Sequence, residues 1–110
     1  RRKYLQGKNQ IEAGNLRLDQ VKREIYIQET FVQLTAKEYL ILEYLLVNFG
    51  AIIKQEELIL HTWGEEDALF YVSLRTHVYN IRKKLQAAGL RGVELANIVN
   101  QGYCIRSLPF

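Results

Sequence analysis

The chain contains no methionine, one cysteine and no hydrophobic run long enough to cross a membrane. Because Cys104 has no second cysteine to pair with, an internal disulfide is excluded, and nothing suggests a secreted disulfide scaffold. The most apolar stretch, residues 39–47, is interrupted by Glu43 and is shorter than the roughly 20 residues that a membrane helix needs. These absences predict a cytoplasmic protein with no membrane segment.

Side chains for catalysis or metal binding are scarce as well. His61 and His77 lie in separate segments and belong to no cluster with metal-ligand spacing, and no base can be placed beside Cys104. We therefore expect no metal site, no cofactor and no enzymatic activity. Cys104 is interpreted as a small buried hydrophobic residue.

The length of 110 residues is the usual size of a single domain with one hydrophobic core. The sequence opens with Arg1, Arg2 and Lys3 rather than with methionine, a start typical of an interdomain linker. We expect residues 1–10 to be a linker from a preceding domain and residues 11–110 to form the folded domain.

Charge is segregated along the chain, although the net charge is only +3. The segment 55–67 has five acidic residues and no Lys or Arg. The segment 68–93 has five Lys or Arg residues and no Asp or Glu. An acid-rich segment beside a cationic one favours a nucleic-acid binder whose other face meets a different partner.

Alternation of apolar and polar residues predicts strands near both ends of the chain. Between Gly14 and Leu34 the pattern predicts short antiparallel strands. Apolar segments at residues 95–99 and 103–105 flank a polar turn and predict a β-hairpin. Residues 52–53 are expected to add a short strand.

Three segments have the periodicity of helices. The first runs from Thr35 to about Asn48 and opens with a capping box, formed by Thr35 and Glu38. The second covers residues 55–62, and the third covers residues 72–87. Each pairs an apolar face with a polar one, as expected of helices packed on one core.

The third predicted helix separates its side chains by chemistry. At about 100° per residue, four apolar residues share one narrow face, and polar and cationic residues surround the rest. Such a helix can enter a major groove with polar side chains toward base edges and cations toward phosphates. We predict base-edge contacts for Ser73, Thr76, Tyr79, Asn80 and Lys83, and backbone contacts for Arg75, His77, Arg82 and Lys84.

Several residues have a structural interpretation beside the functional one. The charges of the third helix could form a merely solvated face, but the absence of acids, the preceding helix and the following hairpin favour nucleic-acid binding. Tyr79 has no core role and is expected to pack on a thymine methyl group or reach a phosphate. For His77, packing and a phosphate contact are equally plausible, and Trp63 is interpreted as a core residue.

A series of short motifs occurs in order along nearly all of residues 14–105. The motifs are residues 34–39, 42–46, 54–58 leading to Trp63-Gly64, His77-Val78, 81–85 and Gly102-Tyr103. In this ordered series the chain resembles the winged-helix effector domain of the OmpR/PhoB family of bacterial response regulators. The resemblance implies an α+β fold, a winged helix-turn-helix with an N-terminal antiparallel sheet, three helices and a C-terminal β-hairpin wing.

The resemblance also implies sequence-specific binding of double-stranded DNA and transcription regulation, as the output domain of a two-component response regulator. The third helix would enter the major groove and the wing would lie near the minor groove. The preceding domain is then a phosphoacceptor receiver, whose phosphorylation promotes homodimers on direct repeats. Residues 64–70, with Glu65, Glu66 and Asp67, correspond to the loop that touches RNA polymerase in activators.

The chain departs from the family pattern in places that matter for specificity. Members often carry Asp-Arg-Thr-Val-Asp where this chain has residues 71–75, and Lys54 replaces the usual Ser or Thr cap of the second helix. The wing has no arginine ahead of its turn, so we expect Asn100 and Gln101 to contact sugar or phosphate. The alternatives are the effector domain of a membrane-anchored one-component activator and a winged helix used as a protein-interaction module.

Overall fold

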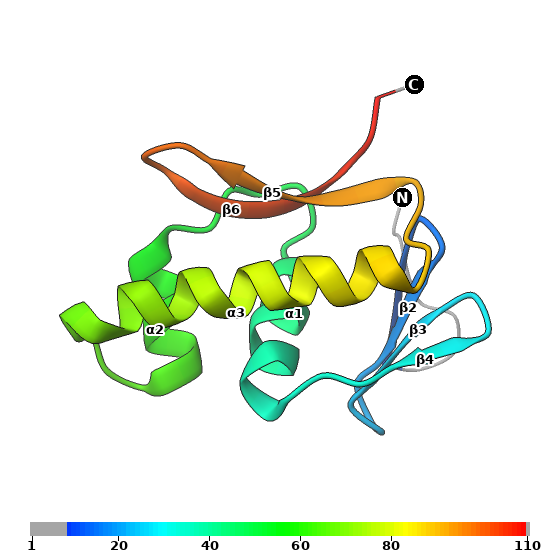
Figure 1. Ribbon diagram of the computed structural model, residues 1–110, viewed down its shortest axis with the longest axis horizontal. Coiled ribbons are helices and arrows are strands. Elements are labelled where there is room, and N and C mark those ends of the chain that lie inside the picture. Colours follow the sequence, from blue (N-terminus) through cyan, green and yellow to red (C-terminus); the bar gives the residue numbers. More distant parts are fainter. Residues whose placement is uncertain (1–8, 110) are drawn as a thin grey trace.

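The computed structural model describes residues 9–109, which form an antiparallel sheet, three helices and a hairpin (Figure 1). The sheet has the strand order β1-β2-β3-β4, with β1 at Gln10–Ala13, β2 at Leu16–Asp19, β3 at Glu24–Ile27 and β4 at Thr30–Val32. The helices are α1 at Ala36–Val47, α2 at Gln55–Trp63 and α3 at Ala68–Ala87. The hairpin pairs β5 at Val93–Ile98 with β6 at Gly102–Ser107. The α+β winged helix-turn-helix expected from the sequence is confirmed.

The start of the chain is described from Asn9 onward. The expected linker, residues 1–10 with Arg1, Arg2 and Lys3, therefore lies almost entirely outside the described residues. Gln10 opens β1, a strand that the alternation pattern did not predict and that pairs with β2. Its four residues bury two apolar side chains, a signal too short to stand out in the sequence.

The first two helices begin and end where local chemistry predicts. The hydroxyl of Thr35 accepts a hydrogen bond from the Glu38 N–H (3.2 Å), and the Glu38 carboxylate accepts one from the Thr35 N–H (2.9 Å). This pair is the predicted capping box. Lys54 gives α2 no side-chain cap, and Gly64 ends α2 in a left-handed conformation, with φ of 83°.

The third helix begins earlier than predicted, at Ala68 rather than residue 72. The carboxylate of Asp67 accepts a hydrogen bond from the Leu69 N–H (2.8 Å) and caps the extra turn. Phe70 in this turn stacks on Trp63, with ring centroids 5.0 Å apart. The added turn is thus held by a cap and an aromatic contact, and Trp63 packs against the core as predicted.

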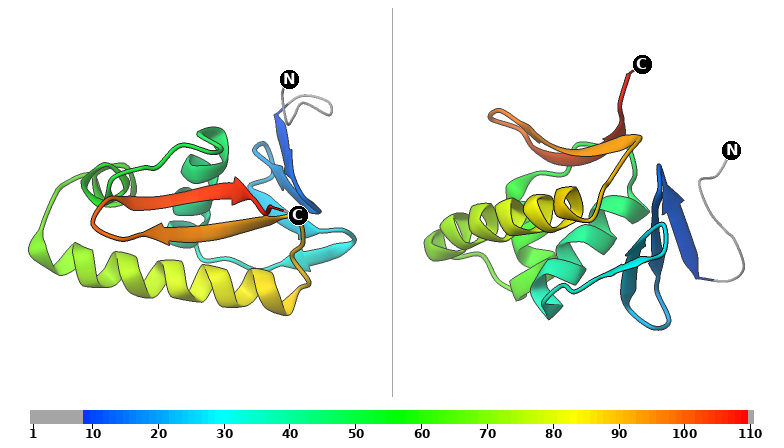
Figure 2. Two further views of the ribbon diagram at one scale, coloured as in Figure 1. Left: turned by 90° about the horizontal axis from the view of Figure 1, so that it is seen from above. Right: turned by 45° about the vertical axis from the view of Figure 1, so that its right-hand side comes forward.

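The hairpin runs alongside α3 and covers the helices on one side (Figure 2). Ile53 and Tyr103 exchange backbone hydrogen bonds of 2.8 and 3.0 Å, so the short strand expected at residues 52–53 is a single bridge to β6. Cys104 is buried in β6, as predicted. No helix among residues 9–109 has the length and apolar character that a bilayer crossing requires.

Asn15 anchors the exit of α3 to the β1–β2 turn. Its side chain donates to the carbonyl of Gly89 (3.0 Å) and accepts from the N–H of Arg91 (2.8 Å). A Cβ atom at Gly14, whose φ is 59°, would lie 2.2 Å from the Arg91 carbonyl oxygen. This close approach fixes the C-terminal end of α3 against the sheet.

Candidate nucleic-acid interface

The helix α3 has one face in the core and one face at the surface. None of the nine residues predicted to contact DNA from this helix is buried. Arg75, Thr76, Tyr79 and Lys83 are exposed, and the other five are half-buried. The buried face consists of Leu74, Val78, Ile81 and Leu85, the four apolar residues predicted from the helical periodicity.

Tyr79 and Lys83 form a pair on the exposed face. The Lys83 ammonium nitrogen lies 5.1 Å from the centroid of the Tyr79 ring. A cation above a tyrosine face is weakly stabilised by the ring quadrupole, which favours one arrangement of both side chains. The prediction that Tyr79 has no core role is confirmed, because 55% of its surface is exposed.

Arg82 is held within the protein, which the sequence did not predict. Its Nε and Nη2 atoms donate to the carbonyl oxygen of Leu95 in β5, at 3.2 and 3.1 Å. This contact joins α3 to the first strand of the hairpin. It leaves the remaining guanidinium N–H groups for another acceptor.

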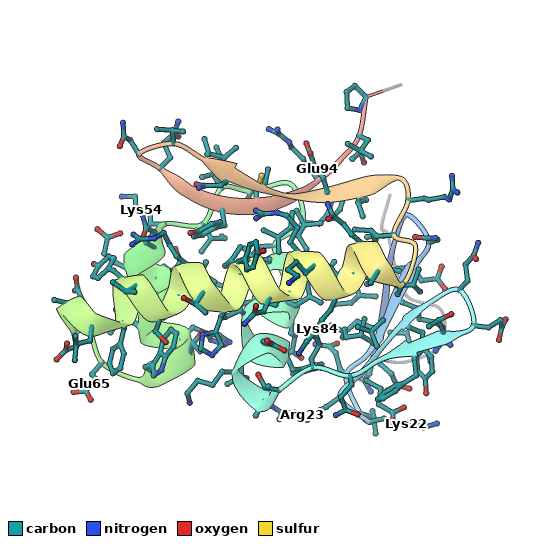
Figure 3. The ribbon with its side chains drawn as sticks, viewed as in Figure 1. Lys22, Arg23, Lys54, Glu65, Lys84 and Glu94 are labelled. Atoms are coloured by element: carbon teal, nitrogen blue, oxygen red, sulfur yellow. The ribbon has the colours of Figure 1, made fainter. Side chains whose placement is uncertain are left out.

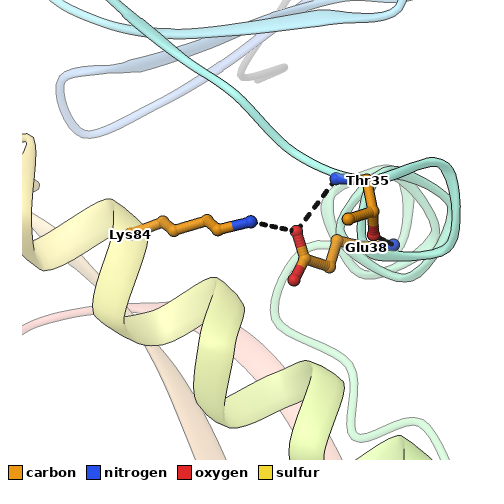
Figure 4. Close-up of polar contacts among 3 residues, drawn as sticks. All are labelled: Thr35, Glu38 and Lys84. Atoms are coloured by element: carbon orange, nitrogen blue, oxygen red, sulfur yellow. Dashed lines mark hydrogen bonds and ion pairs between the residues drawn. The ribbon is translucent and has the colours of Figure 1, made fainter.

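Lys84 is also held within the protein, on the opposite flank of α3 (Figure 4). Its Nζ atom lies 2.7 Å from Oε1 of Glu38, the carboxylate that also accepts from Thr35. Burial disfavours the charged form of Glu38, but the hydrogen bonds from Lys84 and the Thr35 N–H outweigh it, so the pKa of Glu38 is lowered. Lys84, which was predicted to bind phosphate, therefore binds the Glu38 carboxylate of the α1 capping box.

His77 packs within α3 and against α2. Its Nδ1 atom lies 2.7 Å from the carbonyl oxygen of Ser73, which can only accept, so Nδ1 carries the proton. The ring meets Trp63 edge-on, with centroids 5.5 Å apart. In the neutral ring Nε2 is an acceptor, so donation to a phosphate requires the protonated form.

The acidic residues 65–67 lie at the N-terminal end of α3, whereas Lys84 lies in its last turn. Figure 3 shows Glu65 beside the start of α3, whereas Lys84 projects toward α1. Glu66 accepts a hydrogen bond from the Tyr71 hydroxyl (2.5 Å), which raises the pKa of Tyr71 to about 12. Because Asp67 caps α3, the predicted loop of residues 64–70 is shortened to the residues before Ala68.

The wing turn is exposed and lacks a cation. Asn100 and Gln101 lie at its tip, together with Val99, which is 75% exposed. Asn100 has a φ of 64°, a conformation that asparagine tolerates better than most residues. The tip therefore offers amide groups and one apolar side chain to whatever lies beside α3.

These features define a winged helix: α2 and α3 form the helix-turn-helix, and the β5–β6 hairpin is a wing beside α3. The family described as "Transcriptional regulatory protein, C terminal" matches residues 28–105. The chain belongs to this family, and the predicted membership of the OmpR/PhoB-type DNA-binding regulators is confirmed.

Two curated relatives illustrate the similarity. The chain is 36% identical over 78 residues to the transcriptional regulatory protein DltR of Streptococcus agalactiae (serotype III, strain NEM316), covering 71% of this chain and 35% of DltR. It is 30% identical over 97 residues to the sensory transduction protein RegX3 of Mycobacterium leprae, covering 88% and 49%. The chain thus spans between about a third and a half of these relatives.

Solved structures share the fold. The DNA-binding domain of CpxR from E. coli superposes with a TM-score of 0.77 at 22% identity, covering 91% of this chain and 98% of that one. The RstA DNA-binding domain of Klebsiella pneumoniae, solved in complex with the RstA box, gives 0.75 at 23% identity, covering 88% and 96%.

Proposed function

We propose that the chain binds double-stranded DNA sequence-specifically, with the exposed face of α3 in the major groove and the wing near the minor groove. The observation that carries this proposal is α3 itself. Its 20 residues include four cations and no acid, and its apolar face is buried against the protein. A rigidly held cationic helix with an accessible outer face suits a major groove, which is wide enough for an α-helix.

Exposure and contacts with other elements divide the predicted residues of α3 into two groups: those that approach DNA and those that are bound mainly to the protein. Thr76, Tyr79 and Lys83 are exposed and approach base edges, with Ser73 and Asn80 at the margins. Arg75 is an exposed cation on the hairpin side of the helix and binds the phosphate backbone.

The remaining cationic candidates act mainly through the protein. Arg82 and Lys84 set the position of α3 relative to the wing and α1, because both are already bound there. Arg82 retains free N–H groups for a phosphate, and protonated His77 can add one further donor. Asn100 and Gln101 contact sugar or phosphate from the wing.

We propose that the chain is the output domain of a cytoplasmic two-component response regulator. We further propose that this domain has no enzymatic activity. A receiver domain precedes it and promotes homodimers on direct repeats. The exposed acids Glu65, Glu66 and Asp67 of the α2–α3 loop face RNA polymerase; within the protein, Glu66 also accepts from Tyr71 and Asp67 caps α3. The RstA box in the RstA complex supports duplex DNA as the partner.

Selection of bound duplexes from a random pool, followed by sequencing, tests the proposal. We expect the 110-residue chain to enrich one short site, and paired copies of that site in direct orientation if two molecules bind together. A pool that is retained but not enriched would contradict sequence-specific binding. A pool that is not retained at all would favour the alternative of a protein-interaction module.

A further inference from the structure

An apolar stripe runs along the outward face of α3. Val72 is 56% exposed, Tyr79 is 55% exposed and Leu69, in the first turn, is 76% exposed. Thr76 is also exposed and contributes a methyl group between Val72 and Tyr79. We name these four residues the apolar stripe.

The apolar stripe lies where a groove-binding helix meets the bases. At about 100° per residue its members fall within an arc of roughly 80°, opposite the buried face of α3. From Val72 to Tyr79 the helix advances about 10 Å, which matches about three base-pair steps of about 3.4 Å. The stripe is therefore long enough to meet several successive base pairs.

The centre of this face is poor in the side chains that read purines. Arginine or lysine pairs with guanine, and asparagine or glutamine pairs with adenine, through two hydrogen bonds; Lys83 is the one residue of these types within the arc. Arg75 and Asn80 lie at its margins, and Lys83 is the cation within it. The group that an apolar side chain can recognise in the major groove is the 5-methyl group of thymine.

We propose that the apolar stripe reads thymine methyl groups, with Val72, Thr76 and Tyr79 as specificity-determining residues. This inference rests on the proposed function, since it requires α3 to lie in the major groove. It goes further by naming the feature of the DNA that is recognised: a run of thymines within the half-site.

Charge favours duplex DNA over a protein as the occupant of the stripe. Exposed Arg75 flanks the stripe on one side, and Lys83 lies beside the stripe, over the Tyr79 ring. No Asp or Glu occurs in α3 to repel a polyanion. Exposed apolar groups framed by cations suit a surface that is apolar at the bases and anionic at the phosphates.

The test uses a duplex recovered by the selection, prepared with thymine, with 2′-deoxyuridine, or with 5-bromo-2′-deoxyuridine. Deoxyuridine removes one methyl group and keeps the base pair, and bromine restores a group of similar size. We expect about a fourfold loss of affinity per contacted methyl group removed and recovery with bromouracil.

Variants assign the effect to named side chains. Tyr79→Ala and Val72→Ala should each bind the thymine duplex more weakly and abolish the penalty for deoxyuridine at one position. Val47→Ala is the matched control, because Val47 on α1 is also 56% exposed; it should retain the full penalty.

The outcomes separate this inference from the proposed function. Specific binding with an unchanged deoxyuridine penalty in Val72→Ala and Tyr79→Ala would overturn the inference and leave DNA binding intact. The same result would be expected if the stripe served a protein partner. Absence of any duplex binding by the wild-type chain would instead overturn the proposed function.

Discussion

Lys84 Nζ lies 2.7 Å from Glu38 Oε1, so an ion pair joins α3 to the first turn of α1 across 46 positions of sequence. On the other flank of α3, Arg82 binds the Leu95 carbonyl of the wing. The helix α3 is therefore braced on both sides by its own cations. These two contacts join α3 to α1 and to the wing, in addition to the packing of its buried face in the core.

Lys84→Ala should lower the free energy of unfolding by about 1 kcal/mol, because it leaves a buried carboxylate with one fewer donor. The side chain of Lys84 is 37% exposed, so solvent screening keeps the effect below that of a fully buried pair. Urea denaturation measures the change. Lys83→Ala, the neighbouring exposed lysine, should change stability by less than about 0.5 kcal/mol; equal effects would refute the bracing role.

The stability of the fold should fall at acidic pH through Glu38. Its folded pKa is below the usual value of 4.5, so between these two values the unfolded state binds more protons and stability rises with pH. The contribution is therefore complete above the unfolded pKa and is lost as the pH falls through the folded pKa. Denaturation of wild type and Glu38→Gln from pH 3 to pH 6 should show a shallower dependence in the variant; parallel curves would rule out this linkage.

Gly102→Ala should destabilise the wing strongly. The φ of Gly102 is 152°, and an added Cβ would lie 2.0 Å from the Ile53 carbonyl oxygen, which is backbone and cannot simply move away. Gly89→Ala is the control: its φ is 93°, but nothing lies within 4 Å, so only the conformational cost of about 1–2 kcal/mol applies. Thermal unfolding should show a larger loss for Gly102→Ala by at least about 2 kcal/mol.

Arg82→Ala distinguishes a brace from a phosphate contact. If Arg82 mainly holds the wing, the variant should increase hydrogen exchange at β5 amides and destabilise the fold by about 1–2 kcal/mol. Lys83→Ala should leave the β5 amides protected. If Arg82→Ala leaves hydrogen exchange at the β5 amides unchanged and weakens the salt dependence of DNA binding, Arg82 acts through the phosphate contact that the sequence predicted.

Much of the fold could be predicted because its signals are local. The capping box of Thr35 and Glu38 spans one turn, and Gly64 ends α2 through its own conformation. The periodicity of α3 predicted both its buried face and the exposure of Tyr79.

What could not be predicted depends on contacts between distant segments. A cation at the margin of a helix can bind phosphate or a neighbouring element, and only the placement of α1 and the wing showed that Lys84 and Arg82 do the latter. The early start of α3 depends on Phe70 meeting Trp63. Val72, Thr76 and Tyr79 already share the exposed face of the predicted helix, whereas Leu69 joins them only because α3 begins at Ala68.

The most direct test of the central claim is a fluorescence-anisotropy titration of the 110-residue chain on a mixed-sequence duplex across a range of salt concentrations. We predict weak association, and we expect the logarithm of the association constant to fall linearly with the logarithm of the salt concentration. Arg75→Ala should make this slope shallower by about one unit, whereas Lys22→Ala, in the β2–β3 turn, should leave it unchanged. No association at low salt, or a slope that Arg75→Ala does not alter, would contradict the placement of α3 against the phosphate backbone.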